Sequence, residues 1–304
     1  MSAPGISRTD LASVAVFVSA TVWGLYWVPL RMFEANGIEG AWSVTLLNTP
    51  PLLVLLPLCL WHWRAVRPYL GTAIAIGLLG GAGLAFYASG LVFSSVVRAT
   101  LLFYLTPVWA TLIGLFWLGE EVRWQRWAAI AIGLLGMFLL LSGGGQASTP
   151  LNIGDLFGVV SGVFWAGAAA MIKRYPETPL SGMTLFQFLF TALVAVLCGA
   201  IAGPLVLPDP EPVISSLPVA FIASLGLILP TVWIIFWAQK LLFPGRAGLL
   251  MMSEVLVAVI SASIFLPDER MSAIEWFGAV LIIGACLLEV RSTPAENARE
   301  SGPG

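Results

Sequence analysis

One carboxyl group lies deep inside an apolar stretch of this chain. Glu254 falls within the apolar run from Ala247 to Leu266, and inserting a charge at the middle of a membrane helix costs about 2.5–3.5 kcal/mol. Ionisable residues kept at such depth usually face a cavity or a partner. Glu254 is therefore a candidate to contact a substrate ammonium group or to exchange a proton. The alternative is a protonated side chain that hydrogen-bonds to a neighbouring helix, for example to Gln187.

Amides and aromatic side chains accompany this acid near the middle of other apolar segments. An amide can hold the polar end of a solute, and aromatic rings can hold its apolar part or a cation. For any single tryptophan, helix packing explains the position equally well, so the prediction concerns the group. The predicted substrate-binding residues are Trp23, Asn48, Tyr87, Tyr104, Trp109, Trp165, Gln187, Trp233, Trp237 and Glu254.

Prolines at similar depth predict hinges, because proline interrupts the hydrogen bonding of a helix. The candidates are Pro29, Pro107 and Pro230. All fourteen Lys and Arg residues lie at or near the ends of apolar segments, so no fixed cation is available at depth to bind a phosphate. We expect a neutral, zwitterionic or cationic small molecule, with amino acids as leading candidates, and no phosphorylated substrate.

The composition of the chain is typical of a membrane protein. Apolar residues make up 59% of its 304 positions and charged residues 10%, against about 25% charged in soluble domains. The sequence predicts an all-α membrane protein with ten transmembrane helices, each about long enough to cross a ~30 Å hydrocarbon core. We expect them at Leu11–Phe33, Gly40–Leu60, Tyr69–Leu91, Val96–Leu118, Trp124–Leu141, Asp155–Ile172, Leu180–Ile201, Leu217–Trp237, Ala247–Leu266 and Ser272–Leu288.

Basic residues predict the orientation of these helices. With a cytoplasmic N-terminus, the inner segments hold all the Lys and Arg residues except Arg31, Arg98 and Arg270, as the positive-inside rule requires. We therefore expect an inner or plasma membrane protein with cytoplasmic tails at residues 1–10 and 291–304.

The two halves of the chain resemble each other. A spacing of 148 residues relates Arg98-Ala99 to Arg246-Ala247 and Glu121 to Glu269, and a slightly shorter one relates Trp23 to Trp165 and Arg31 to Lys173. We expect a five-helix repeat at 11–142, a linker at 143–154 and a second repeat at 155–290. Because five is odd, the second copy enters the membrane from the opposite side, and such inverted-topology repeats accompany alternating access around a site near the midplane.

Glycines spaced four residues apart predict close helix packing. They are Gly77 and Gly81, and then Gly154, Gly158 and Gly162. Because ten helices offer ample partners within one chain, we expect these contacts to be intramolecular and the protein to be a monomer.

Paired motifs in the two halves resemble a known family. The first pair is Trp23-Gly24 before the basic residue Arg31, and Trp165-Ala166 before Lys173. The second pair is Thr106-Pro107 and Ser253-Glu254-Val255. The third pair is Gly-Glu120-Glu121 and Pro-Asp268-Glu269. Over essentially the whole chain this order resembles the drug/metabolite transporter superfamily, specifically its ten-helix EamA-type exporters. The chain departs from that pattern at Asn48 and Gln187, where the family often has Arg or another polar residue, and at Val255, where it often has Pro.

This resemblance implies a secondary active exporter. Thirteen tryptophans and an aromatic content of 12% look most like the aromatic amino-acid exporters of the YddG type. The cargo would then be amino acids, including aromatic or bulky apolar ones. A carrier of broader specificity for amphipathic cations or other metabolites, and a passive channel, stay open as alternatives.

Other classes find no support in the sequence. It contains no His-Glu-x-x-His motif, paired aspartates or Ser/His constellation within the helices, and no Gly-rich loop ending in Lys-Ser or Lys-Thr, so we expect neither an enzyme nor ATP hydrolysis. Cys59, Cys198 and Cys286 have neither metal-ligand spacing nor a pairing pattern. We expect no cofactor, no metal and no nucleic-acid partner.

Overall fold

The computed structural model describes residues 7–94, 99, 102–141, 152–203, 205–265 and 272–292. Six helical segments in this part of the chain are long and apolar enough to cross a membrane, and two shorter apolar helices accompany them. The six are Arg8–Ala35, Ala41–Trp61, Trp63–Leu91, Ile153–Arg174, Leu180–Ala202 and Pro210–Gln239. The ten-helix inverted repeat stays a prediction. Outside the described residues lie Arg98, Asp268, Glu269, residues 143–151 of the predicted linker and most of both predicted tails.

Several helices begin and end close to the predicted positions. α9 covers the predicted residues Trp124–Leu141, and α11 covers Leu180–Ala202. α6 (Leu70–Phe93), α10 (Ile153–Arg174) and α16 (Ala273–Ser292) differ from the prediction by a few residues. α10 begins at Ile153 because Asn152 and Asp155 form a capping box that satisfies its first backbone N–H groups.

Other apolar segments are interrupted where the sequence predicted continuous helices. The pieces are α1 (Arg8–Trp23) and α2 (Trp27–Ala35), α3 (Ala41–Asn48) and α4 (Pro50–Trp61), α12 (Pro210–Ala223), the π-helical segment η3 (Ser224–Ile228) and α13 (Leu229–Gln239), and α14 (Pro244–Met251) and α15 (Ser253–Phe265). α8 (Thr106–Trp117) begins directly after a turn at Tyr104 and Leu105. Two short pieces, α5 (Trp63–Val66) and η1 (Arg67–Tyr69), lead from α4 into α6.

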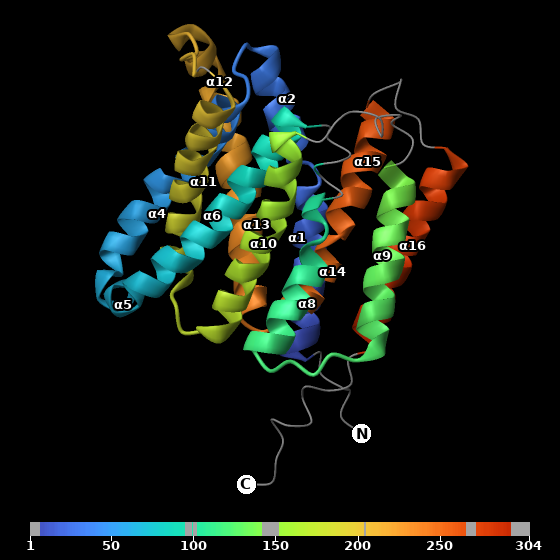
Figure 1. Cartoon of the computed structure of the whole chain (residues 1–304). Coiled ribbons are helices and arrows are strands. Elements are labelled where there is room, and N and C mark those ends of the chain that lie inside the picture. Colours follow the sequence, from blue (N-terminus) through green and yellow to red (C-terminus); the bar gives the residue numbers. More distant parts are fainter. Residues whose placement is uncertain are drawn as a thin grey trace.

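The helices pack as a bundle around α6, α10 and α1 (Figure 1). α6 lies between α10 and α11, while α1 contacts α13, α14 and α15. α9 and α16 pack against each other along one side of the bundle (Figure 1).

The predicted glycine contacts are present within the chain. A Cβ atom at Gly77 or Gly81 would lie less than 3.0 Å from backbone atoms of α11. A Cβ at Gly154 would lie 2.5 Å from the backbone nitrogen of Ser94, and one at Gly162 would lie 2.8 Å from the carbonyl oxygen of Phe103. The prediction that these glycines allow close intramolecular packing is confirmed.

Two groups of charged residues connect helices at the lower end of the bundle, which we define as the end where α10 and α13 finish (Figure 1). Lys173 Nζ donates to the carbonyl oxygen of Leu241 at 2.7 Å, and Lys240 Nζ donates to that of Thr178 at 2.7 Å. The Lys173 ammonium also lies 4.6 Å from the centre of the Phe243 ring. These two lysines tie the α10–α11 connection to the α13–α14 connection.

The second group is a buried ion-pair cluster. Arg126 Nη1 contacts Glu120 Oε1, and Arg126 Nη2 lies 2.7 Å from Glu289 Oε1. The Glu120 and Glu289 side chains are 3% and 1% exposed. The cluster joins the α8–α9 connection, the start of α9 and the end of α16.

Candidate functional site

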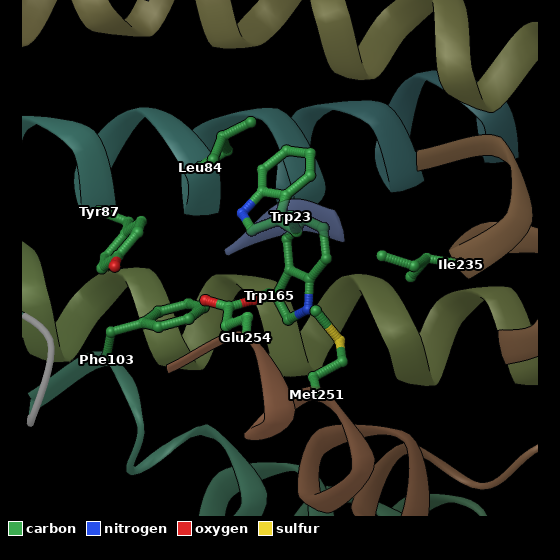
Figure 2. A pocket seen from close by; sticks show the side chains of 8 residues that line it. All are labelled: Trp23, Leu84, Tyr87, Phe103, Trp165, Ile235, Met251 and Glu254. Atoms are coloured by element: carbon green, nitrogen blue, oxygen red, sulfur yellow. The ribbon is translucent and has the colours of Figure 1, made fainter. Parts of the chain in front are cut away.

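A small cavity lies between continuous and broken helices in the interior of the bundle (Figure 2). Its volume is about 20 Å³, which is room for about one water molecule. It is lined by Trp23, Leu84, Tyr87, Phe103, Trp165, Ile235, Met251 and Glu254. Four of these side chains are aromatic, and Glu254 is the one charged residue among them.

The break after α1 supplies one wall of the cavity. Trp23 is the last residue of α1, and the turn at residues 24–26 separates it from α2. In that turn Tyr26 stacks on Trp23, with ring centroids 4.9 Å apart and planes 7° apart. The stacking fixes the Trp23 indole, which is only 6% exposed.

Trp165 reaches the cavity from the middle of the uninterrupted helix α10. Gly83 of α6 allows the two helices to approach here, since a Cβ at Gly83 would lie 3.0 Å from the backbone nitrogen of Trp165. The Trp165 indole Nε1 is buried and makes no hydrogen bond to the described residues. It is therefore available to donate to a ligand.

Glu254 stands at the break between α14 and α15. It lies in the first turn of α15 and is 5% exposed. The Tyr104 side chain lies next to the carboxyl group. Tyr104 in turn packs edge-on against Phe103, with centroids 5.1 Å apart, and Phe103 lies 4.4 Å from Tyr87.

The cavity brings together four of the ten residues predicted to bind substrate. They are Trp23, Tyr87, Trp165 and Glu254, and the Tyr104 side chain lies next to that of Glu254. The other five do not line it and are Asn48, Trp109, Gln187, Trp233 and Trp237. A binding role for all ten residues stays a prediction.

The two predicted amides hydrogen-bond within their own helices. Asn48 is fully buried, its Nδ2 donates to the carbonyl oxygen of Val44 at 2.8 Å, and its side chain lies next to that of Tyr26. Gln187 Nε2 donates to Thr191 Oγ1 at 3.1 Å. Depth along a helix placed both amides near the middle, but depth alone does not determine which way a side chain points.

Sequence reasoning missed Leu84, Phe103, Ile235 and Met251. The spacing of 148 residues could have found Ile235, because it relates Tyr87 to Ile235, and it also relates the two missed residues Phe103 and Met251 to each other. Both members of each pair line the cavity, as do Trp23 and Trp165, which the shorter spacing relates.

All three predicted hinge prolines lie close to an interruption. Pro107 is in the first turn of α8, and Pro230 is in the first turn of α13, directly after η3. Pro29 follows the turn between α1 and α2. Whether these prolines act as hinges stays a prediction.

The chemistry of the cavity suits a small organic molecule. Aromatic faces attract cations and cover apolar groups, and a carboxylate pairs with an ammonium group. The described residues contain no cluster of three or more His, Cys, Asp or Glu side chains that could hold a metal ion. Apolar helices of membrane-spanning length around such a cavity define a multi-pass membrane protein with an internal cavity.

Comparison with known proteins identifies the family. The model of the EamA-like transporter family matches residues 11–142 and 152–291. The chain belongs to this family and is a membrane transporter of the EamA kind, within the drug/metabolite transporter superfamily. A solved crystal structure shares its fold with a TM-score of 0.71 and 21% sequence identity, covering 97% of this chain and 100% of that one.

The relatives of this chain are named for different substrates. An S-adenosylmethionine uptake transporter of Rickettsia felis is 25% identical over 47% of this chain and 49% of its own length. The chain therefore spans about half the length of the first curated relatives it matches. An uncharacterized transporter of Archaeoglobus fulgidus is 30% identical over 53% of this chain and 55% of its own length. A probable amino-acid metabolite efflux pump of Escherichia coli is 22% identical over 94% of this chain and 96% of its own length.

Proposed function

We propose that this transporter exports amino acids, including aromatic or bulky apolar ones, by alternating access around the aromatic cavity. The observation that carries the proposal is the combination of four aromatic rings with the single carboxyl group of Glu254. The rings would cover an apolar side chain, and Glu254 would pair with the ammonium group. The amino-acid metabolite efflux pump, which is similar over nearly the whole chain, supports this cargo.

A carrier mechanism is supported by the size of the cavity. A space of about 20 Å³ holds a water molecule but no amino acid. Cargo must therefore enter through a rearrangement of the helices that surround the cavity, and the breaks at residues 24–26, Tyr104 and Met252 are where such a rearrangement would concentrate. A passive channel would instead need a continuous path.

The arrangement of the cavity supports the two inverted five-helix repeats. Residues that the proposed repeats relate to each other line one shared cavity, as an internal two-fold axis requires. We propose that the lower end faces the cytoplasm, since it carries Lys173, Lys240 and Arg126. The transporter would act as a monomer in the inner or plasma membrane, and it would export cargo when the ties made by the two lysines open.

A second candidate cargo is an amphipathic cation such as S-adenosylmethionine. The Rickettsia relatives named for its uptake support it. This molecule combines an aromatic base and a sulfonium cation with an amino-acid group, and four aromatic rings beside a carboxylate suit each of the first two groups.

A competition panel in liposomes tests the proposal. Purified protein should move labelled phenylalanine or S-adenosylmethionine without ATP, with saturable flux and with counterflow when unlabelled cargo is trapped inside. Flux that never saturates and shows no counterflow would indicate a channel. Competition by phosphate esters, with none from amino acids or S-adenosylmethionine, would refute the proposed cargo class.

A further inference from the structure

We infer that the cavity selects for organic cations and binds them in preference to the zwitterions of amino acids. This inference rests on the proposed function, because it concerns the same cavity. It adds the net charge of the preferred cargo, which the sequence analysis left open between neutral, zwitterionic and cationic molecules.

The charge of the lining carries the first step. Of the eight residues around the cavity, Glu254 is the one carboxylic acid, and none is basic. Trp23, Tyr87, Phe103 and Trp165 line the same cavity as Glu254 (Figure 2). Aromatic rings attract cations through the negative potential of their faces, and they offer a carboxylate no comparable contact.

The geometry of an amino acid carries the second step. Its ammonium and carboxylate groups are bonded to the same carbon atom, so an ammonium paired with Glu254 brings the substrate carboxylate close to the Glu254 carboxylate. Like charges at such a distance disfavour each other's ionised form. A cation without that carboxylate avoids the repulsion.

No described basic residue on the same helical segment can offset this repulsion. Arg246 is the basic residue of α14, it precedes Glu254 by eight positions across the turn at Met252, and it does not line the cavity. The positive N-terminal end of α15 already adjoins Glu254 itself. A substrate carboxylate beside Glu254 therefore meets no charge of opposite sign from either source.

The uncharged donor in the lining fits a neutral oxygen better than a carboxylate. Trp165 Nε1 is buried without a hydrogen-bond partner among the described residues. A single N–H donor satisfies the carbonyl oxygen of an ester or an amide, but a carboxylate needs several donors or a cation to replace its water shell. Cations that carry an amide or an ester fit this lining as well as simple amines.

Three compounds with the same phenyl group separate the possibilities. The permanent cation is phenethyltrimethylammonium, the zwitterion is phenylalanine, and the anion is 3-phenylpropionate. Binding to the purified full chain is measured by calorimetry or by ligand-dependent shifts of the melting temperature, so no labelled cargo is needed. Inhibition of flux in liposomes provides a second readout.

We expect the cation to bind at least tenfold more tightly than phenylalanine, and the anion to show no binding. In Glu254→Gln the preference for the cation over phenylalanine should fall to less than about threefold. Glu34→Gln is the matched control, because Glu34 is an exposed glutamate whose carboxylate pairs with Arg31 at 3.9 Å, and it should keep the full preference.

The outcomes that overturn the inference differ from those that overturn the proposed function. If phenylalanine binds as tightly as the cation, or if Glu254→Gln leaves the preference unchanged, the inference is wrong while amino-acid transport stands. Tightest binding of the anion also overturns it. If none of the compounds binds or inhibits flux, the proposed function fails as well.

Discussion

Gly81→Ala should destabilise the bundle even though alanine is the better helix former. An added Cβ at position 81 would lie 2.6 Å from the carbonyl oxygen of Gln187 and 2.8 Å from the backbone nitrogen of Thr191. Both atoms belong to the backbone of α11, so no side-chain rotation can relieve the contact. α11 must move away from α6 as a whole.

Gly80→Ala, one residue earlier on α6, is the control. Its Cβ would lie 3.4 Å from the Gln187 and Phe236 side chains, at ordinary contact distance. Both substitutions gain the same helix propensity, about 1 kcal/mol, so their difference isolates the steric cost. Overpacking a close contact costs about 1–3 kcal/mol, and the two variants should differ in unfolding free energy by this amount.

The assay is unfolding of both variants in the same detergent, by heat and by titration with a denaturing detergent. Gly81→Ala should unfold first by both criteria, and Gly80→Ala should match or exceed the unmodified protein. If Gly81→Ala is as stable as Gly80→Ala, α6 and α11 do not approach each other as closely as the structure has them.

Two other substitutions test the lower end of the bundle. Arg126→Met leaves two buried carboxylates without their cation and should lower the free energy of unfolding by about 3–5 kcal/mol. Arg31→Met removes an exposed ion pair and should change that free energy by less than about 1 kcal/mol. Equal melting temperatures of the two variants would contradict the buried cluster. Lys173→Met keeps the apolar stem but removes the contact with the α13–α14 connection. A cysteine introduced at the buried position Thr178 should then react several-fold faster with a polar maleimide. An unchanged rate would show that Lys173 does not hold the lower end closed.

Hydrophobic length predicted where most helices lie, because lipid demands about twenty apolar residues for each crossing. Trp124–Leu141 was predicted to the residue, and α11 ends one residue beyond its prediction. The breaks within apolar segments were harder to predict. Pro29, Pro107 and Pro230 follow three of these breaks. The turn at Met252 has no proline beside it, and the apolar sequence continues across it without a signal.

The candidate site was predictable where a residue type was unusual for its surroundings. Glu254 stands out as a carboxyl group in an apolar run, and Trp23 and Trp165 stand out as related indoles. Phe103 and Met251 look like ordinary lipid-facing or packing residues in the sequence. They reach the cavity because the helices break next to them, which is a property of the packed bundle.

The rotation of each helix about its axis was the other unknown. Gln187 was placed near the middle of the membrane by counting residues, yet the segment that carries it packs its backbone against Gly77 and Gly81. Asn48 lies beside Tyr26, the ring that stacks on Trp23. A single sequence gives depth along a helix, whereas the direction of a side chain depends on which neighbours the helix finds.

The central claim is that cargo passes through this cavity. Its most direct test is counterflow of labelled phenylalanine in liposomes that contain the Glu254→Gln variant. The unmodified protein and Glu34→Gln should show saturable counterflow without ATP. Glu254→Gln should lose several-fold of that flux with no fall in melting temperature, because the substitution keeps size and most hydrogen bonding while removing the charge that faces the aromatic rings. Unchanged saturable flux in Glu254→Gln would contradict the claim that Glu254 and its cavity bind the cargo.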